Sequence, residues 1–123
     1  MNRIFLDTSF LLSCSEFNVD WFSEFQRLFG KFELVLITGV LKELEGLSQG
    51  SSKKSRQAKI ALLVLENKKY LLKESRGKVD SALVNLPLRT DLVATQDSEL
   101  KSRLKSRGIS VLVLKQKQFV ALG

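Results

Sequence analysis

The sequence of 123 residues contains no histidine and only one cysteine, Cys14. The absence of histidine excludes serine–histidine and cysteine–histidine catalysis, histidine general bases and metal sites built on imidazole. Any metal ion would be held mainly by oxygen, which favours hard ions such as Mg²⁺ or Mn²⁺. A single cysteine cannot form a disulfide framework and fits a reducing cytosol. Because Cys14 lies close to Leu11 and Phe17 in the sequence, we expect a small core hydrophobe rather than a nucleophile.

Long apolar runs are also missing. No apolar stretch approaches the roughly eighteen residues that a membrane-spanning helix needs. The apolar run that follows Met1–Arg3 is too short for a signal peptide. We therefore expect a cytoplasmic protein that has no membrane partner. The length is that of one domain, residues 1–123, which is large enough to bury a core without disulfides or structural metals.

Acidic residues are absent from two stretches of a chain whose net charge is +7. One stretch lies between Glu45 and Glu66, and the other follows Glu99. The basic residues in them that we single out as candidate nucleic-acid contacts are Lys53, Lys54, Arg56, Lys101, Arg103 and Lys105. Such blocks suit a polyanionic partner, most simply nucleic acid. Charge alone does not distinguish this interpretation from ordinary solvated helix faces.

Short apolar runs alternate with segments of helical periodicity along the chain. The runs predict five strands, at Ile4–Leu6, Glu33–Ile37, Tyr70–Lys73, Leu92–Thr95 and Ser110–Leu114. Thr38 is expected to cap the helix that follows the second strand, and residues 115–123 are expected to form a basic tail with an apolar end. This order indicates an α/β fold with a mostly parallel five-stranded sheet and helices on both of its faces.

The longest predicted helix runs from Lys53 to Lys68. Its first half is basic, and its second half, Ile60–Leu65, is apolar nearly all the way round. A helix of that kind is either central in the fold or covered by a partner chain. In so small a protein we expect a contact in a homodimer.

Asp7 follows the first apolar run directly and begins the sequence Asp7-Thr8-Ser9. In open α/β sheets, ligands bind outside the carboxyl ends of the strands, so a charged group at that point is a candidate site residue. The alternative is that Asp7 only caps the next helix, since aspartate is a favoured N-cap. Asp7 taken alone does not separate the two interpretations.

Three further acids fall at the same predicted edge of the sheet. Asp97 lies two residues beyond the fourth strand, and Glu43 and Asp80 lie in the opening turns of helices that begin there. Four carboxylates that meet in one place repel one another unless a cation offsets their charge, and Mg²⁺ is the simplest such cation. Bound Mg²⁺ or Mn²⁺ would activate water to attack a phosphodiester, and the basic blocks would hold the nucleic-acid backbone. Taken singly, Asp80 and Asp97 are also ordinary caps or first-turn acids, and Glu43 and Glu45 ordinary flank residues.

Four short motifs carry a resemblance to a known family. They are Phe5-Leu6-Asp7-Thr8-Ser9, Val40-Leu41-Lys42-Glu43-Leu44, Val79-Asp80-Ser81-Ala82-Leu83-Val84 and Val93-Ala94-Thr95-Gln96-Asp97-Ser98-Glu99-Leu100. In this order and spacing the chain resembles a PIN domain. It is most similar to the small archaeal VapC-like group, itself similar to nucleases that mature small-subunit ribosomal RNA.

The resemblance implies a metal-dependent ribonuclease with sheet order 3-2-1-4-5. It assigns metal binding to Asp7, Glu43, Asp80 and Asp97, with Glu43 preferred over Glu45. Further roles fall to Ser9, a hydroxyl that orients Asp7 or water, to Thr95, a hydroxyl near Asp97, and to Glu99, acting through water. The protein would be a toxin paired with an antitoxin or an RNA-processing enzyme. The chain departs from the family pattern at Leu86–Asp91, so we expect the helix that carries Asp80 to be shorter or bent.

Two other functions compete with an RNA-cleaving enzyme. A non-catalytic RNA-binding module in ribosome assembly would use the basic helices alone. A phosphotransfer or phosphatase domain with Asp7 as nucleophile is disfavoured, because the accompanying acidic residues of such domains are missing. No glycine-rich phosphate loop is present either, which argues against nucleotide hydrolysis.

Overall fold

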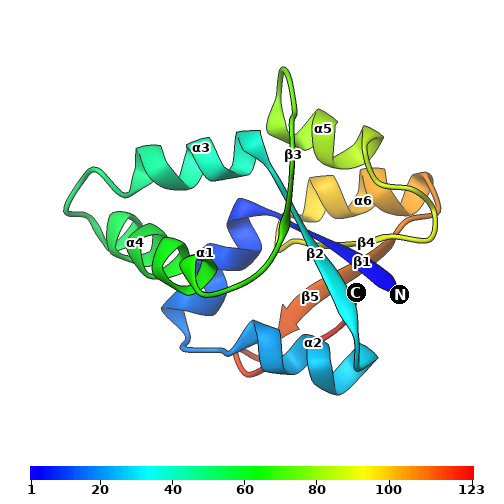
Figure 1. Ribbon diagram of the computed structural model, residues 1–123, viewed down its shortest axis with the longest axis horizontal. Coiled ribbons are helices and arrows are strands. Elements are labelled where there is room, and N and C mark those ends of the chain that lie inside the picture. The colour runs from blue at the N-terminus through cyan, green and yellow to red at the C-terminus, as the bar shows by residue number, and fades with distance from the viewer.

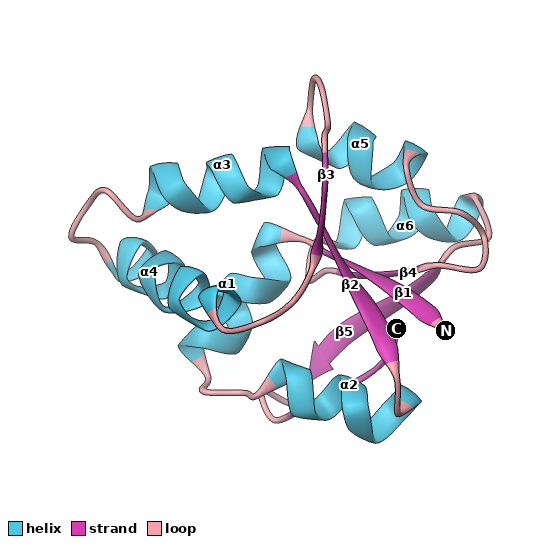
Figure 2. Ribbon diagram, in the orientation of Figure 1, coloured by secondary structure: helices cyan, strands magenta, loops and turns pink.

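The computed structural model describes residues 1–123 and shows a chain of six strands and six helices (Figures 1 and 2). The elements in order are β1 (Asn2–Leu6), α1 (Thr8–Glu16), α2 (Trp21–Phe29), β2 (Phe32–Ile37), α3 (Thr38–Leu47), α4 (Lys53–Glu66), β3 (Leu71–Lys73), α5 (Val79–Asn85), β4 (Leu92–Ala94), α6 (Ser98–Ser106), β5 (Ser110–Lys115) and β6 (Phe119–Leu122). The predicted α/β class is confirmed.

The strands form one sheet in the order β3-β2-β1-β4-β5-β6. All neighbours from β3 to β5 are parallel, which confirms the predicted order 3-2-1-4-5. The prediction of only five strands is wrong, because β6 pairs antiparallel with β5. Residues 115–123 were expected as a basic tail. The turn before β6 has positive φ at Gln116 (53°) and Lys117 (58°), neither of them a usual turn residue, so the sequence gives little sign of a hairpin there.

The core lies between the sheet and two layers of helices. In Figure 1, α5 and α6 lie above the strands, α2 lies below them, and α1 lies to their left, packed beside α4. The middle strands are buried on both faces, which explains why their sequences are continuously apolar. Cys14 is 1% exposed and belongs to this core, as expected, and burial raises the pKa of its thiol to about 12.

Helix ends agree with the sequence signals with one exception. The Asp20 carboxylate caps α2 by accepting a hydrogen bond from Ser23 N, 3.1 Å away, and Gly30 (φ 70°) ends the helix. The prediction that Thr38 caps α3 is wrong, because Ile37 occupies the N-cap position without a side-chain bond. The Thr38 hydroxyl instead accepts a hydrogen bond from Ser75 N (3.0 Å), in the segment before α5.

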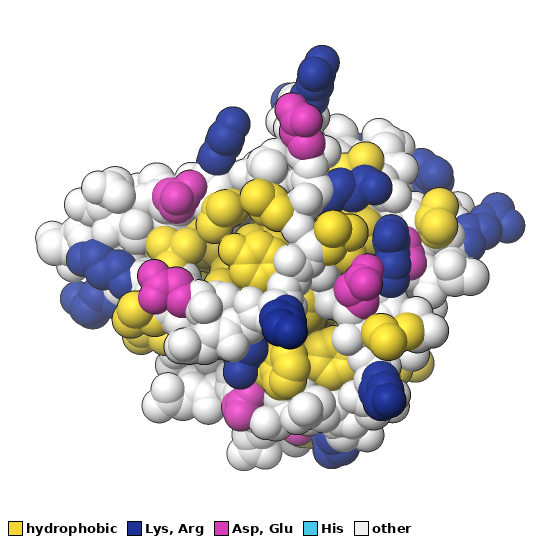
Figure 3. Space-filling view, in the orientation of Figure 1, with side chains coloured by type: hydrophobic (Ala, Val, Ile, Leu, Met, Phe, Trp, Pro, Cys, Tyr) yellow, Lys and Arg dark blue, Asp and Glu magenta, His cyan; other side chains and the backbone are white.

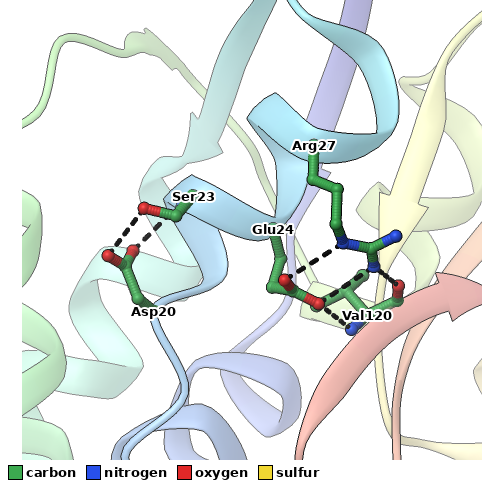
Figure 4. A network of polar contacts seen from close by, with 5 residues as sticks. All are labelled: Asp20, Ser23, Glu24, Arg27 and Val120. Carbon is green, nitrogen blue, oxygen red and sulfur yellow. Dashed lines mark hydrogen bonds and ion pairs between the residues drawn. The ribbon is translucent and has the colours of Figure 1, made fainter.

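The β6 edge of the sheet is closed by side chains from α2 (Figure 4). Glu24 Oε1 accepts a hydrogen bond from Val120 N (2.8 Å), and Arg27 Nη2 donates to Val120 O (2.9 Å). Glu24 and Arg27 also pair with each other, and the bond from Arg27 lowers the pKa of the Glu24 carboxyl. An exposed strand edge invites pairing with another chain, so these bonds protect the edge at Val120.

Some apolar side chains remain on the surface. On the face drawn in Figure 3, they gather between α3, α4 and β3, and charged side chains of both signs are spread around them. Leu72 of β3 is 47% exposed, and Ile60 and Leu63 of α4 are 44% and 59% exposed. None of the helices combines the length and the apolar character needed to cross a membrane.

Candidate active site

Four helices begin at the carboxyl edge of the parallel strands, and each brings one acidic residue to that edge. Strand β1 leads to α1, β2 to α3, β3 to α5 and β4 to α6. The hollow at this edge measures about 690 Å³. Its lining includes all four predicted acids, Asp7, Glu43, Asp80 and Asp97. Segments far apart in the sequence thus meet as the strand-end argument predicted.

Asp7 is the buried member of the four, at 5% exposed. Its Oδ1 accepts a hydrogen bond from Thr8 N (2.8 Å), and its Oδ2 accepts from the hydroxyls of Ser9 (2.7 Å) and Thr95 (2.7 Å). Burial raises the pKa of the Asp7 carboxyl despite these bonds, and the negative charge of Asp80 raises it further. Ionised Asp7 therefore costs free energy that a nearby cation would offset.

The two hydroxyls that bind Asp7 also organise the start of α6. Ser9 Oγ accepts a hydrogen bond from Gln96 N (3.0 Å), and Thr95 Oγ1 accepts one from Asp97 N (3.1 Å). One polar network consequently ties Asp7 at the end of β1 to the backbone next to Asp97. Ser9 and Thr95 thus lie beside Asp7 and Asp97, the acids near which the resemblance implied these two hydroxyls.

Glu43 is exposed on α3 and is held by one hydrogen bond. The hydroxyl of Thr8 donates to Glu43 Oε1 over 2.6 Å. Because the backbone N–H of Thr8 also donates to Asp7, this single residue contacts both acids. Glu45 is not part of the lining of the hollow, in agreement with the preference for Glu43.

Asp97 both caps a helix and lines the hollow. Its Oδ1 accepts hydrogen bonds from Glu99 N (2.9 Å) and Leu100 N (3.1 Å) at the start of α6. The capping interpretation is therefore correct for Asp97, as it is for Asp7, and does not exclude a further role. The Glu99 side chain is exposed and does not line the hollow.

Asp80 differs from the other three acids because its carboxylate accepts no hydrogen bond from the protein. It is exposed in the first turn of α5, which has only 7 residues. That helix ends at Asn85, two residues before Pro87, so the expectation of a short helix is confirmed.

The donor set of the hollow suits a hard divalent cation. Glu43 Oε2, Asp97 Oδ2 and both oxygens of Asp80 have no protein partner, and Asp7 uses three of its roughly four lone-pair positions. No three of the acids converge tightly enough to form a closed cluster of ligands. The residues therefore fit an ion such as Mg²⁺, which binds through a few carboxylates and keeps several waters.

Of the six basic residues predicted to contact nucleic acid, only Lys54 lines the hollow. Lys53 forms an ion pair with Glu16, and the Arg56 guanidinium donates to the backbone oxygen of Ser51 (3.4 Å). The remaining three, Lys101, Arg103 and Lys105, lie on α6 outside the lining.

Sequence reasoning missed several polar residues of the hollow. Thr8 was part of a motif but received no role, and neither did Lys42 or Gln57, which line the hollow. Lys42 precedes Glu43, and Gln57 lies three residues after Lys54 on the same helix. That spacing places Gln57 on the face of Lys54 and is the one signal that would have found it.

Comparison with known proteins supplies a family, a relative and a solved structure. The family described as "PIN like domain" matches residues 4–117. Ribonuclease VapC4 of Methanocaldococcus jannaschii is 30% identical over 125 residues, covering 97% of this chain and 95% of the relative. The structure of the PIN domain endonuclease Utp24 matches with a TM-score of 0.81 and 24% identity, covering 98% of this chain and 90% of that chain. At that identity, the structural match shows a shared fold.

Proposed function

The chain belongs to the PIN-like domain family, and from that premise we propose that it is a Mg²⁺- or Mn²⁺-dependent endoribonuclease that hydrolyses RNA phosphodiester bonds. The observation that carries this proposal is the meeting of Asp7, Glu43, Asp80 and Asp97 in one hollow, where each retains acceptor capacity. The relative with 30% identity is named a ribonuclease, which supports RNA as the substrate.

The four carboxylates would hold the metal ion, and the hydroxyl network would keep them in place. A bound divalent cation polarises the phosphodiester and lowers the pKa of a water molecule, so that hydrolysis needs no histidine. Ser9 and Thr95 fix Asp7 by donating to the same oxygen, Oδ2, which leaves the remaining capacity on Oδ1. Thr8 fixes one oxygen of Glu43 and leaves the other free. Glu99 is assigned a weaker part, a contact through water.

Lys54 and the basic residues of α6 would bind the RNA backbone. Lys54 lies in the lining of the hollow, which supports a contact with the phosphates next to the cleaved bond. The other predicted contacts, Lys53, Arg56, Lys101, Arg103 and Lys105, would bind RNA outside the hollow. The ion pair of Lys53 with Glu16 makes Lys53 the weakest candidate among them.

The proposal for the cellular role is supported by the relative rather than by the site. We propose that the protein is the toxin of a toxin–antitoxin pair that acts in the cytoplasm, and the 30% identity to ribonuclease VapC4 of Methanocaldococcus jannaschii supports this role. An adjacent reading frame for a small DNA-binding antitoxin, and its co-purification with this chain, would test the assignment. Ribosomal RNA processing is the other candidate role, and the absence of such a reading frame would favour it.

A homodimer would cover the exposed apolar side chains of α4. Ile60 and Leu63 lie three residues apart on one face of this helix, and both are about half exposed. Burial against a second copy would remove this apolar surface from water. Sedimentation equilibrium tests the proposal, because a monomer at micromolar concentrations would contradict it.

A cleavage assay tests the enzyme itself. Single-stranded and structured RNA are incubated with the protein in Mg²⁺, in Mn²⁺ and in a chelator. We expect cleavage with either metal and none with the chelator, and a loss of at least about 100-fold in Asp7→Asn. RNA binding that persists in Asp7→Asn, together with no cleavage by the wild-type protein under any condition, would identify a non-catalytic RNA-binding module instead.

A further inference from the structure

Asp80 depends on the backbone of α5 for its position. No protein group donates a hydrogen bond to its carboxylate, in contrast to Asp7, Glu43 and Asp97. The helix itself is short, and its N-cap residue, Lys78, makes no side-chain capping bond. Whatever holds the start of α5 therefore also sets the distance from Asp80 to the other acids.

A set of hydrogen bonds joins the segment before α5 to the first residues of α3. Ser75 Oγ accepts from Gly39 N over 2.9 Å, and Ser75 N donates to Thr38 Oγ1 over 3.0 Å. The Thr38 hydroxyl also lies 3.3 Å from Ser75 Oγ and 3.4 Å from Ser75 O. Since α3 carries Glu43, these bonds tie the segment that leads into α5 to one of the acid-bearing helices.

Van der Waals contact reinforces the same junction. A Cβ at Gly39 would lie 2.9 Å from Val79 Cγ2, closer than real Cβ atoms approach a neighbour, and 3.0 Å from Ser75 Oγ, which is tighter than nearly all real Cβ contacts. The first residue of α5, immediately before Asp80, therefore packs on the bare backbone of α3. A methyl group at position 39 would therefore force Val79, or the helix that carries it, to move.

We propose that Thr38, Gly39, Ser75 and Val79, called here the α3–α5 junction, position Asp80 relative to Glu43 for binding of the divalent cation. Ser75 and Gly39 are positioning residues and do not touch the ion. The inference rests on the proposed function, because it assumes that Asp80 and Glu43 share a metal ion. It also explains how Asp80 keeps its place although α5 lacks a side-chain cap and departs from the family pattern at its end.

Mn²⁺ binding without RNA, measured by isothermal titration calorimetry, tests the proposal directly. We expect Ser75→Ala to weaken Mn²⁺ binding by about tenfold, the scale of losses at groups that orient ligands. Its unfolding midpoint should fall by no more than about 4 °C, since the lost bonds are half-exposed. In the Asp80→Asn background the same substitution should have no further effect on Mn²⁺ affinity, because it acts through Asp80.

Gly39→Ala supplies a second, independent perturbation. The added methyl group should displace α5 and weaken Mn²⁺ binding at least as much as Ser75→Ala does. Removal of the opposing methyl groups in Gly39→Ala/Val79→Ala should recover most of the affinity. Ser48→Ala is the control for loss of a serine hydroxyl outside the junction, at the C-cap of α3, and should bind Mn²⁺ like the wild type.

The outcomes separate the junction from the function on which it rests. Wild-type protein that binds no Mn²⁺ would overturn the proposed function and the role of the junction with it. Wild-type protein that binds Mn²⁺ with an affinity unchanged in Ser75→Ala and Gly39→Ala would overturn the role of the junction alone. An equal loss of Mn²⁺ affinity from Ser75→Ala in the wild-type and the Asp80→Asn backgrounds would also overturn the role of the junction. The effect of Ser75 would then not act through Asp80.

Discussion

Asp7 is buried although its chemistry requires a charge. Three hydrogen bonds favour its ionised form, yet burial outweighs them and raises the pKa of the carboxyl. In the folded chain the proton is therefore held to a higher pH than in the unfolded chain. The raised pKa of Asp7 contributes most to the stability of the fold below the pKa of this carboxyl in the unfolded chain, near 3.8. The contribution is lost as the pH rises through the raised pKa of the folded chain. At neutral pH, Asp7 thus destabilises the fold that supports it, as a metal ligand without its metal would.

This conflict predicts that Asp7→Asn inactivates the protein and stabilises it near neutral pH. In metal-free urea unfolding, the free energy of unfolding of Asp7→Asn relative to wild type should rise between pH 4 and pH 7, by about 1 kcal/mol or more. Asp20→Asn is the matched control at an exposed cap. Hydrogen bonds from Ser23 lower the pKa of Asp20. The free energy of unfolding of Asp20→Asn relative to wild type should therefore change with pH in the opposite direction. A relative stability of Asp7→Asn that does not vary with pH would contradict the prediction.

Among the elements, β6 shows how a strand can be stabilised by side chains from a helix. Glu24 and Arg27 bind the two outward-facing backbone groups of Val120, so the final strand depends on α2 as well as on β5 (Figure 4). We predict that Glu24→Ala increases amide hydrogen exchange at Val120 by about tenfold, the effect of losing one charge-assisted hydrogen bond. Amides of β1 should not change, because β1 lies in the middle of the sheet.

The pH dependence of Val120 gives a second measurement of the same contact. The pKa of Glu24 is lowered, so its contribution is present above the unfolded pKa and is lost as the pH falls through the folded value. Protection of Val120 in the wild-type protein, corrected for intrinsic exchange, should therefore fall in acid. Gln26→Ala, on the same helix and exposed, is the control. Equal protection of Val120 in Glu24→Ala and in wild type would contradict the proposed role.

The strand signals were sufficient to predict most of the fold, and the reason is the parallel sheet. Strands buried on both faces must be continuously apolar, so their ends are sharp, and an acid directly after such an end is conspicuous, as at Leu6–Asp7. The sixth strand was missed because unusual residues form the turn before it, and because one contact that stabilises it, like the contacts of Thr38, involves a partner distant in sequence. Val120 needs Glu24, and Thr38 needs Ser75. The bond from Thr8 to Glu43 spans 35 residues and was hidden for the same reason.

For the whole molecule, the excess of positive charge matters less than its position. The net charge is +7, but charged side chains of both signs are mixed on the face drawn in Figure 3. Of the six candidate nucleic-acid contacts, only Lys54 lies in the lining of the acidic hollow. Positive charge spread over the surface attracts RNA but does not fix its position. A lysine beside the acids, such as Lys54, fixes which phosphate enters the site.

This difference predicts unequal effects for two substitutions that remove the same charge. In the inactive Asp7→Asn background, the affinity for a single-stranded RNA is measured against salt concentration for Lys54→Ala and for Lys31→Ala. Lys31 is exposed before β2, at the edge of the sheet opposite the hollow. Loss of one phosphate contact reduces the slope of log affinity against log salt by about 0.7 for single strands. We expect that reduction for Lys54→Ala only. Equal reductions for both variants would show that RNA responds to net charge and that the hollow does not position its backbone.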